Sequence, residues 1–152
     1  MKSAALIALA LILAAAAQVA LAPKLAVFGA RPDFLLVAVT LLCMNRGTDS
    51  AAVIGFFAGL LHGGVGNTKM AALVISRILG AIAASLVGRT TVAATPLTVM
   101  GASLAASGVA SMAYMLLGVP KDLWGWVLST FGMIVYNTVL VGFLRMVANY
   151  RR

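Results

Sequence analysis

The chain has 152 residues, of which 63% are hydrophobic and 9% are charged, and its net charge is +8. Soluble domains carry roughly a quarter charged residues and need polar atoms to cover their surface. This composition therefore excludes an ordinary water-soluble domain and indicates that the chain lies in a bilayer as one transmembrane domain over residues 1–152. The basic residues are spread singly and do not alternate with aromatic residues, which argues against a nucleic-acid-binding protein.

The first apolar segment is uncharged and covers residues 3–22. At about 1.5 Å per residue it is long enough to cross a hydrocarbon core of about 30 Å, so we predict a transmembrane helix there. The preceding Lys2 and the sequence ALA at 20–22 are also typical of a cleavable signal peptide. Both interpretations stay open at this stage.

A shorter apolar run follows at 33–45. Pro32 suits the first position of a helix, and Asp33 suits the positive end of the helix dipole. A helix of this length reaches only about 20 Å, so it thins the bilayer locally, tilts little or fails to cross. A tight polar turn, RGTD, then leads into a further apolar run at 50–64. We therefore predict that residues 33–64 form a helical hairpin.

Three more apolar segments predict helices at 70–88, 95–118 and 124–148. The last begins with Trp124 and Trp126, which suit the membrane–water interface. The expected fold is an all-α, polytopic membrane bundle of about six helices, or four spans plus a re-entrant hairpin. Either count puts both termini on one side of the membrane.

The distribution of basic residues predicts the orientation of the chain in the membrane. An excess of Lys and Arg marks the cytoplasmic side. With the termini in the cytoplasm, six basic residues lie inside and four lie outside. The six are Lys2, Arg46, Arg89, Arg145, Arg151 and Arg152, and the four are Lys24, Arg31, Lys69 and Lys121. The sequence therefore favours cytoplasmic termini.

One face of the predicted helix at 50–64 is formed mainly by glycines and is called the bare face, because it lacks bulky side chains. Gly55, Gly59, His62 and Gly63 lie on one side of that helix and continue to Gly66. Helices in lipid attract one another through close backbone contact and hydrogen bonds, so this face indicates a neighbouring helix, in the same bundle or in a partner protein. Two weaker ladders of small residues are Gly80–Ala84–Gly88 and Ser103–Ser107–Ser111.

Two polar residues stand out inside the predicted helices. His62 is expected to make a buried hydrogen bond or to act as a pH-responsive or ligand-contacting group. Arg77 lies near the middle of its helix, where a charge is unfavourable and usually faces the bundle interior. Its partner is Asp33, Asp49, a backbone carbonyl or an anionic ligand, unless the side chain reaches the interface.

No catalytic set is found. An intramembrane enzyme needs a nucleophile with a base, or paired carboxylates. The sequence GAS at 101–103 is superficially similar to the serine motif of rhomboid proteases, but Leu104 follows it and the only histidine lies upstream. We therefore expect no enzymatic activity, and we expect no cofactor. A metal site is also not expected, because one His and the lone Cys43 supply too few ligands. Asn137 and Tyr136 are expected to make ordinary interhelical hydrogen bonds.

The stretch RPDFLLVAVTLLCMNRGTDSAAVIGFFAGLLHGG, residues 31–64, resembles the signature of the rod shape-determining protein MreD family. Members have a Pro-Asp start to a short apolar helix, a small polar turn and then a Gly-Phe-x-x-Gly-Leu helix. The matching residues are Pro32, Asp33, Gly55, Phe56, Gly59 and Leu60. The chain length and the six-helix hydropathy agree with that family across nearly the whole sequence. His62 departs from the pattern, because many members carry an acidic residue thereabouts.

The resemblance implies a non-catalytic scaffold subunit of the bacterial cell-elongation complex in the inner membrane. Such subunits bind MreC and, through it, couple the MreB cytoskeleton to peptidoglycan synthesis by RodA and its penicillin-binding partner. We expect a small-residue face to receive the partner's transmembrane helix, with the hairpin 33–64 as the docking place.

A second class of function stays open. The MreD fold is thought to be similar to that of the substrate-binding S components of energy-coupling-factor vitamin transporters. Those proteins have six helices and a first helix rich in alanines at four-residue spacing, as at Ala4–Ala8 and Ala10–Ala14 here. Arg77 and His62 would then line a ligand cavity. Cell-shape genes in the genomic neighbourhood favour the scaffold, and a copurified vitamin favours the transporter.

Overall fold

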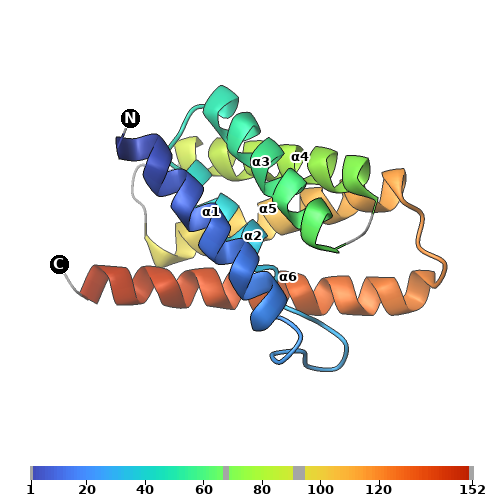
Figure 1. The fold of residues 1–152 in the computed structure, drawn as a ribbon. Helices are drawn as coiled ribbons and strands as arrows, with labels where there is room; N and C mark the ends of the chain where they lie inside the picture. The colour runs from blue at the N-terminus through green and yellow to red at the C-terminus, as the bar shows by residue number, and fades with distance from the viewer. Residues whose placement is uncertain (1, 67–68, 91–94, 151–152) are drawn as a thin grey trace.

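The computed structural model describes residues 2–66, 69–90 and 95–150, and these residues form six helices (Figure 1). The helices are α1 (Lys2–Ala20), α2 (Phe34–Cys43), α3 (Thr48–Gly66), α4 (Met70–Thr90), α5 (Pro96–Leu117) and α6 (Leu123–Tyr150). The described part of the chain contains no β-strand, only an isolated bridge between Val27 and Ala30. The predicted all-α bundle of six helices is confirmed, and so is the hairpin, because α2 and α3 pack against each other.

The short helix α2 is the centre of the bundle and contacts every other helix. Its sequence, FLLVAVTLLC, has no charged residue and is apolar on all sides, which is typical of a fully enclosed helix. Its buried residues are Leu35, Leu36, Val37, Val39, Thr40 and Cys43. By contrast, α1 contacts only α2 and α3 among the described elements.

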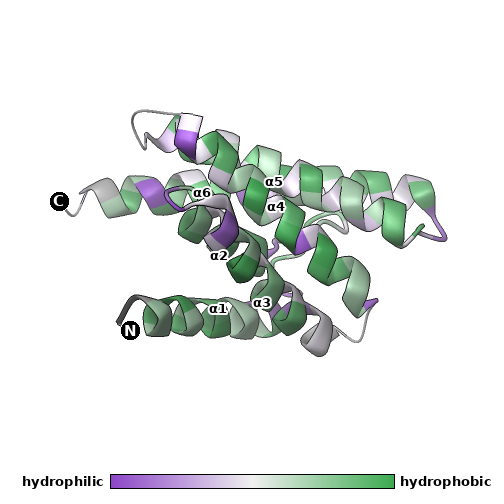
Figure 2. Cartoon of the chain, turned by 90° about the horizontal axis from the view of Figure 1, so that it is seen from above, coloured by the Kyte–Doolittle hydropathy of each residue, from purple (hydrophilic) through white to green (hydrophobic). Residues whose placement is uncertain are grey.

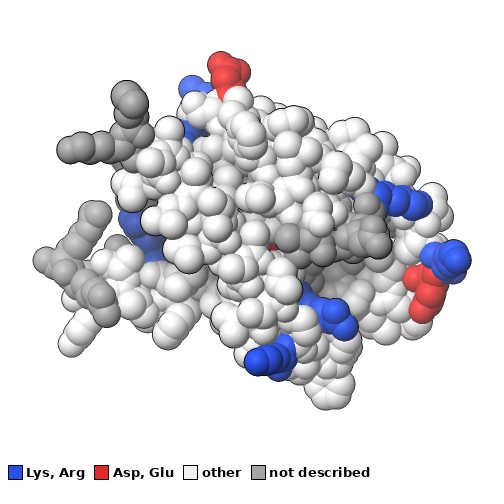
Figure 3. All heavy atoms as spheres, in the orientation of Figure 1, with Lys and Arg blue, Asp and Glu red and all other residues white. Residues whose placement is uncertain are grey.

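The outside of the bundle is apolar. Leu13 on α1 is 60% exposed and Phe131 on α6 is 69% exposed, and many other large apolar side chains are similarly placed. Hydrophilic segments lie mostly at the helix ends and connections (Figure 2), and charged side chains sit mostly at the margins of the face drawn in Figure 3. By length and composition α4, α5 and α6 are able to cross a membrane, whereas the described apolar part of α1, Ala4–Ala20, is shorter. The chain is therefore a helical membrane protein.

The helix α2 begins inside the bundle, not at its edge. The amide of Asp33, the residue before α2, is hydrogen-bonded to Asn137 near the middle of α6. Asn137 in turn is bonded to Ser107 near the middle of α5. A ten-residue helix rises about 15 Å, half of a hydrocarbon core of about 30 Å. The short predicted segment is thus a half-length helix that starts at mid-level. The start of α1 and the end of α6 lie at the same end of the bundle (Figure 1).

The glycine face of α3 is packed directly against α4. A Cβ atom on Gly55 would lie 2.6 Å from the backbone oxygen of Arg77, and one on Gly59 would lie 2.5 Å from the Cα of Val74. A Cβ on Gly63 would lie 3.1 Å from the Met70 side chain. The predicted neighbouring helix is confirmed, and it is α4 of the same chain. The expectation that this face receives a partner helix is therefore corrected, because α4 already covers it.

The two weaker ladders are also used inside the bundle. A Cβ on Gly80 would meet the backbone oxygen of Ala106 in α5 at 3.0 Å. One on Gly88 would collide with the backbone of Met44, just after α2. Ser103 and Ser107 are fully buried. Small residues in this chain thus fix the mutual approach of α2, α3, α4 and α5.

Candidate functional site

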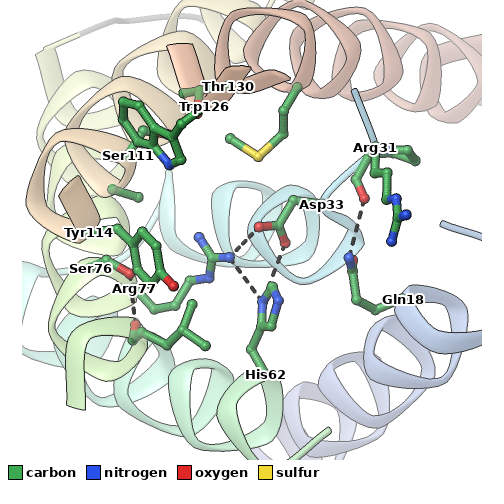
Figure 4. A pocket seen from close by; sticks show the side chains of 14 residues that line it. Gln18, Arg31, Asp33, His62, Ser76, Arg77, Ser111, Tyr114, Trp126 and Thr130 are labelled. Carbon is green, nitrogen blue, oxygen red and sulfur yellow. Dashed lines mark hydrogen bonds and ion pairs between the residues drawn. The ribbon is translucent and has the colours of Figure 1, made fainter. Parts of the chain in front are cut away.

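Three polar side chains from separate elements meet at the start of α2. Asp33 caps this helix, because its Oδ1 accepts a hydrogen bond of 2.9 Å from the amide of Leu36. Arg77 in α4 donates from Nη2 to Asp33 Oδ2, and the same nitrogen lies 2.9 Å from Nδ1 of His62 in α3. Figure 4 shows the guanidinium group of Arg77 facing both of the other side chains. Asp33 and Arg77 are 4% and 5% exposed, so this is a buried ion pair.

The contact with Arg77 fixes the tautomer of His62. A guanidinium group donates hydrogen bonds and cannot accept them, so Nδ1 of His62 is the acceptor and the ring proton is assigned to Nε2. His62 Nδ1 also lies 3.9 Å from Asp33 Oδ1. Of the roles that the sequence left open for His62, the structure shows a polar contact inside the bundle. Of the partners considered for Arg77, the structure selects Asp33.

The backbone at the start of α2 is held by two further helices. Asn137 in α6 accepts a hydrogen bond of 2.9 Å from the amide of Asp33, and its side-chain amide donates to Ser107 Oγ at 3.3 Å. Gln18 in α1 accepts from the amide of Phe34 at 2.8 Å and donates to the carbonyl of Pro32 at 3.3 Å. The first amides of a helix have no partner within the helix. Here Asp33, Asn137 and Gln18 supply those partners.

Sequence reasoning identified some of these residues and missed others. Asp33, His62 and Arg77 were singled out, and the expected interhelical hydrogen bond of Asn137 is confirmed by its bond to Ser107 in α5. Gln18 was missed, although it is the one polar side chain in residues 4–22 and that isolation is a usable signal. The side chain of Tyr136 makes no hydrogen bond within the described part of the chain.

Pro32 is fully buried next to the ion pair. It precedes the first helical residue by two positions, so it ends the connection between α1 and α2 and does not start the helix. Because proline has no amide hydrogen, a buried proline at this point leaves no donor without a partner. The carbonyl of Pro32 is satisfied by Gln18.

A cavity of about 270 Å³ opens beside the ion pair, and residues from every helix except α2 itself line it (Figure 4). Ten of its fourteen lining residues have polar side chains: Gln18, Arg31, Asp33, His62, Ser76, Arg77, Ser111, Tyr114, Trp126 and Thr130. The other four are Pro32, Leu73, Ala110 and Met133. In contrast, a groove of about 400 Å³ between α1 and α3 is lined only by apolar residues. The sequence placed Arg77 and His62 in a ligand cavity only under the transporter alternative. The other lining residues were not predicted, because they are scattered over more than a hundred positions.

Comparison with known proteins adds no relative to these observations: no family model, no curated protein and no solved structure matches the chain. Within residues 2–66, 69–90 and 95–150, no group of three or more His, Cys, Asp or Glu side chains is placed to hold a metal ion. Ser103, the serine of the GAS sequence, is fully buried and its hydroxyl has no hydrogen-bond partner in the described part.

Proposed function

We propose that this chain is a non-catalytic scaffold subunit of the bacterial cell-elongation complex, similar to the MreD family. It docks the transmembrane helix of MreC and, through MreC, links the MreB cytoskeleton to peptidoglycan synthesis by RodA and its penicillin-binding partner. One observation carries the proposal: four of the six residues of the resemblance occupy positions on which the fold depends. Asp33 caps the central helix, Pro32 is buried beside it, and Gly55 and Gly59 set the distance from α3 to α4.

The groove between α1 and α3 is the docking surface that we assign to the MreC helix. Its lining residues are Ala4, Ile7, Ala8, Leu11, Ile12, Val53, Ile54, Phe57 and Leu61. Ala4 and Ala8 are four residues apart and face the groove, so they let another backbone approach α1 closely. The groove carries no charged residue, which suits the apolar side chains of a membrane-crossing helix.

Copurification of MreC with the full chain from membranes tests this assignment. Ala8→Phe fills the groove, and we expect it to reduce the recovery of MreC at least tenfold. Ala16→Phe is the matched control: it makes the same change in the same helix at an exposed alanine outside the groove, and it should retain MreC. Equal recovery of MreC with both variants at normal membrane levels would contradict the docking surface.

The proposed location is the inner membrane, with both termini in the cytoplasm. The support is the six-to-four distribution of basic residues between the two sides. A reporter that is active only in the cytoplasm, fused after Arg152, should be active. Activity of a periplasm-only reporter at the same position would reverse the orientation.

A substrate-binding subunit similar to the S components of vitamin transporters is the second candidate. The polar cavity around Arg77 and His62 favours it, because a scaffold has no evident need for such a cavity. Mass spectrometry of the purified chain should find a bound vitamin if this candidate is right. Cell-shape genes around the coding sequence, with no vitamin in the purified protein, would reject it.

A further inference from the structure

Several hydrogen-bond donors in the polar cavity have no acceptor within the described part of the chain. Arg77 is 5% exposed, yet its Nε atom is buried with no hydrogen-bond partner in the described part of the chain. A buried guanidinium edge without an acceptor is unfavourable. Nη2 already contacts both Asp33 and His62, so Nη1 is the nitrogen of this group that stays open to a ligand in the cavity.

Other donors converge on the same space. Trp126 points its indole nitrogen into the cavity, and Tyr114 lies beside the side chain of Arg77 (Figure 4). Neither side chain makes a hydrogen bond within the described residues, and neither does that of Thr130. Arginine and tryptophan side chains only donate hydrogen bonds. A ligand that satisfies this set must therefore be rich in acceptors.

The charge of the lining gives the charge of the ligand. Arg31 and Arg77 are positive and Asp33 is negative, and His62 accepts a hydrogen bond in its neutral form. The lining therefore has one positive charge that no residue of the cavity balances, and this charge belongs to Arg31, an exposed residue. Oxyanions are strong acceptors for guanidinium donors, because both partners of such a hydrogen bond are charged.

We propose that this cavity binds a singly charged phosphate oxyanion, which accepts hydrogen bonds from Arg77, Tyr114 and Trp126. The cavity extends from Asp33 inside the bundle to Trp126 in the first turn of α6, and tryptophan at such a helix end commonly meets lipid headgroups. A cavity of about 270 Å³ has room for a phosphate headgroup. The oxyanion is either the headgroup of an anionic lipid or free phosphate. The site is independent of partner docking, because the groove assigned to MreC shares no residue with the cavity.

The two sources are separated by two probes applied to the full chain in neutral detergent. In the first arm, native mass spectrometry measures how much phosphatidylglycerol the protein retains, with phosphatidylcholine as the uncharged lipid. In the second arm, inorganic phosphate is titrated while the unfolding temperature is followed. Retention of phosphatidylglycerol over phosphatidylcholine supports a lipid headgroup, and stabilisation by phosphate supports a free ion.

The variants avoid the ion pair, because loss of Arg77 leaves Asp33 buried without its partner. The double variant Tyr114→Phe with Trp126→Phe removes two donors and keeps two aromatic rings in place. Hydrogen bonds to a charged acceptor are strong, so we expect it to weaken binding by roughly tenfold or more. The control is Trp124→Phe, at a tryptophan that is 73% exposed and outside the cavity.

Two results would overturn the proposal. If neither probe binds the wild-type chain, the cavity holds only water and the site does not exist. If a probe binds equally to the wild type, the double variant and Trp124→Phe, it binds elsewhere. Thr130→Val, which removes another lining hydroxyl at almost constant volume, gives an independent check if the double variant does not fold.

Discussion

Asp33 and Arg77 are 44 positions apart in the sequence and form an ion pair that is almost completely buried where α2, α3 and α4 meet. Asp33 has two roles in this arrangement, because one carboxylate oxygen caps α2 and the other accepts from the guanidinium group. The capping oxygen stabilises the half-length helix at mid-level. The other oxygen connects that helix to α4, whose backbone also packs against the glycines of α3.

The roles of Asp33 can be separated by Asp33→Asn, which keeps a capping side chain but removes the negative charge. Arg77 then stays buried without a counter-charge, and we expect the free energy of unfolding to fall by about 3 kcal/mol. Titration of the unfolding in mixed SDS micelles measures this change. Asp49→Asn, at an exposed aspartate in the first turn of α3, should change stability by less than about 1 kcal/mol.

A second substitution tests whether the charge is the cause. Arg77→Met in the Asp33→Asn background removes the orphaned charge, so the double variant should recover part of the lost stability. A double variant that is less stable than Asp33→Asn alone would show that the ion pair does not explain the loss.

The contact between α3 and α4 should not tolerate even one methyl group at Gly59. The added Cβ in Gly59→Ala would lie 2.5 Å from the backbone of Val74, which cannot move aside as a side chain would. Overpacking of this kind costs about 1–3 kcal/mol, and thermal unfolding in detergent measures it. Gly101→Ala is the matched control in α5, where a Cβ meets no atom within 4 Å. There we expect higher stability, because alanine favours a helix more than glycine does.

The link between α2 and α6 depends on Asn137. In Asn137→Leu the amide of Asp33 loses its acceptor in a buried place, which costs about 1–3 kcal/mol. Chemical unfolding of the purified chain gives the value. Thr138→Val is the adjacent control, since the Thr138 hydroxyl bonds only to the carbonyl of Ile134 in its own helix. Equal losses of stability in the two variants would refute the role of Asn137 as the acceptor for the amide of Asp33.

Cys43 is a built-in probe of the packing around α2. It is the only cysteine of the chain and is fully buried, so a maleimide reagent should label the native protein very slowly. Gly88→Ala places a methyl group into the backbone of Met44, next to Cys43, and should increase the labelling rate several-fold. Intact-mass measurements over time follow the reaction. Gly64→Ala, where a Cβ has open space, should label at the wild-type rate.

Composition and periodicity alone determined that this protein lies in a membrane, that it is helical and that one helix face is closely packed. An apolar chain with few charges has no soluble fold available, so the membrane and the succession of helices followed directly from residue types. The glycines at 55, 59 and 63 lie on one helix face by geometry, and a bare face in lipid requires a close neighbour. These inferences need only local information, because hydropathy and helix periodicity are properties of short segments.

The identity of the neighbours was decided by the tertiary structure. Nothing in the segment around Gly59 distinguishes α4 of the same chain from the helix of a partner, because the same small residues suit both. Likewise, no local pattern places Asp33, Gln18 and Asn137 at one point, since α1 and α6 must first pack against α2 to bring them together. The cavity beside Arg77 exists only in that packed arrangement, so its donors and its charge are properties of the fold and not of any single segment.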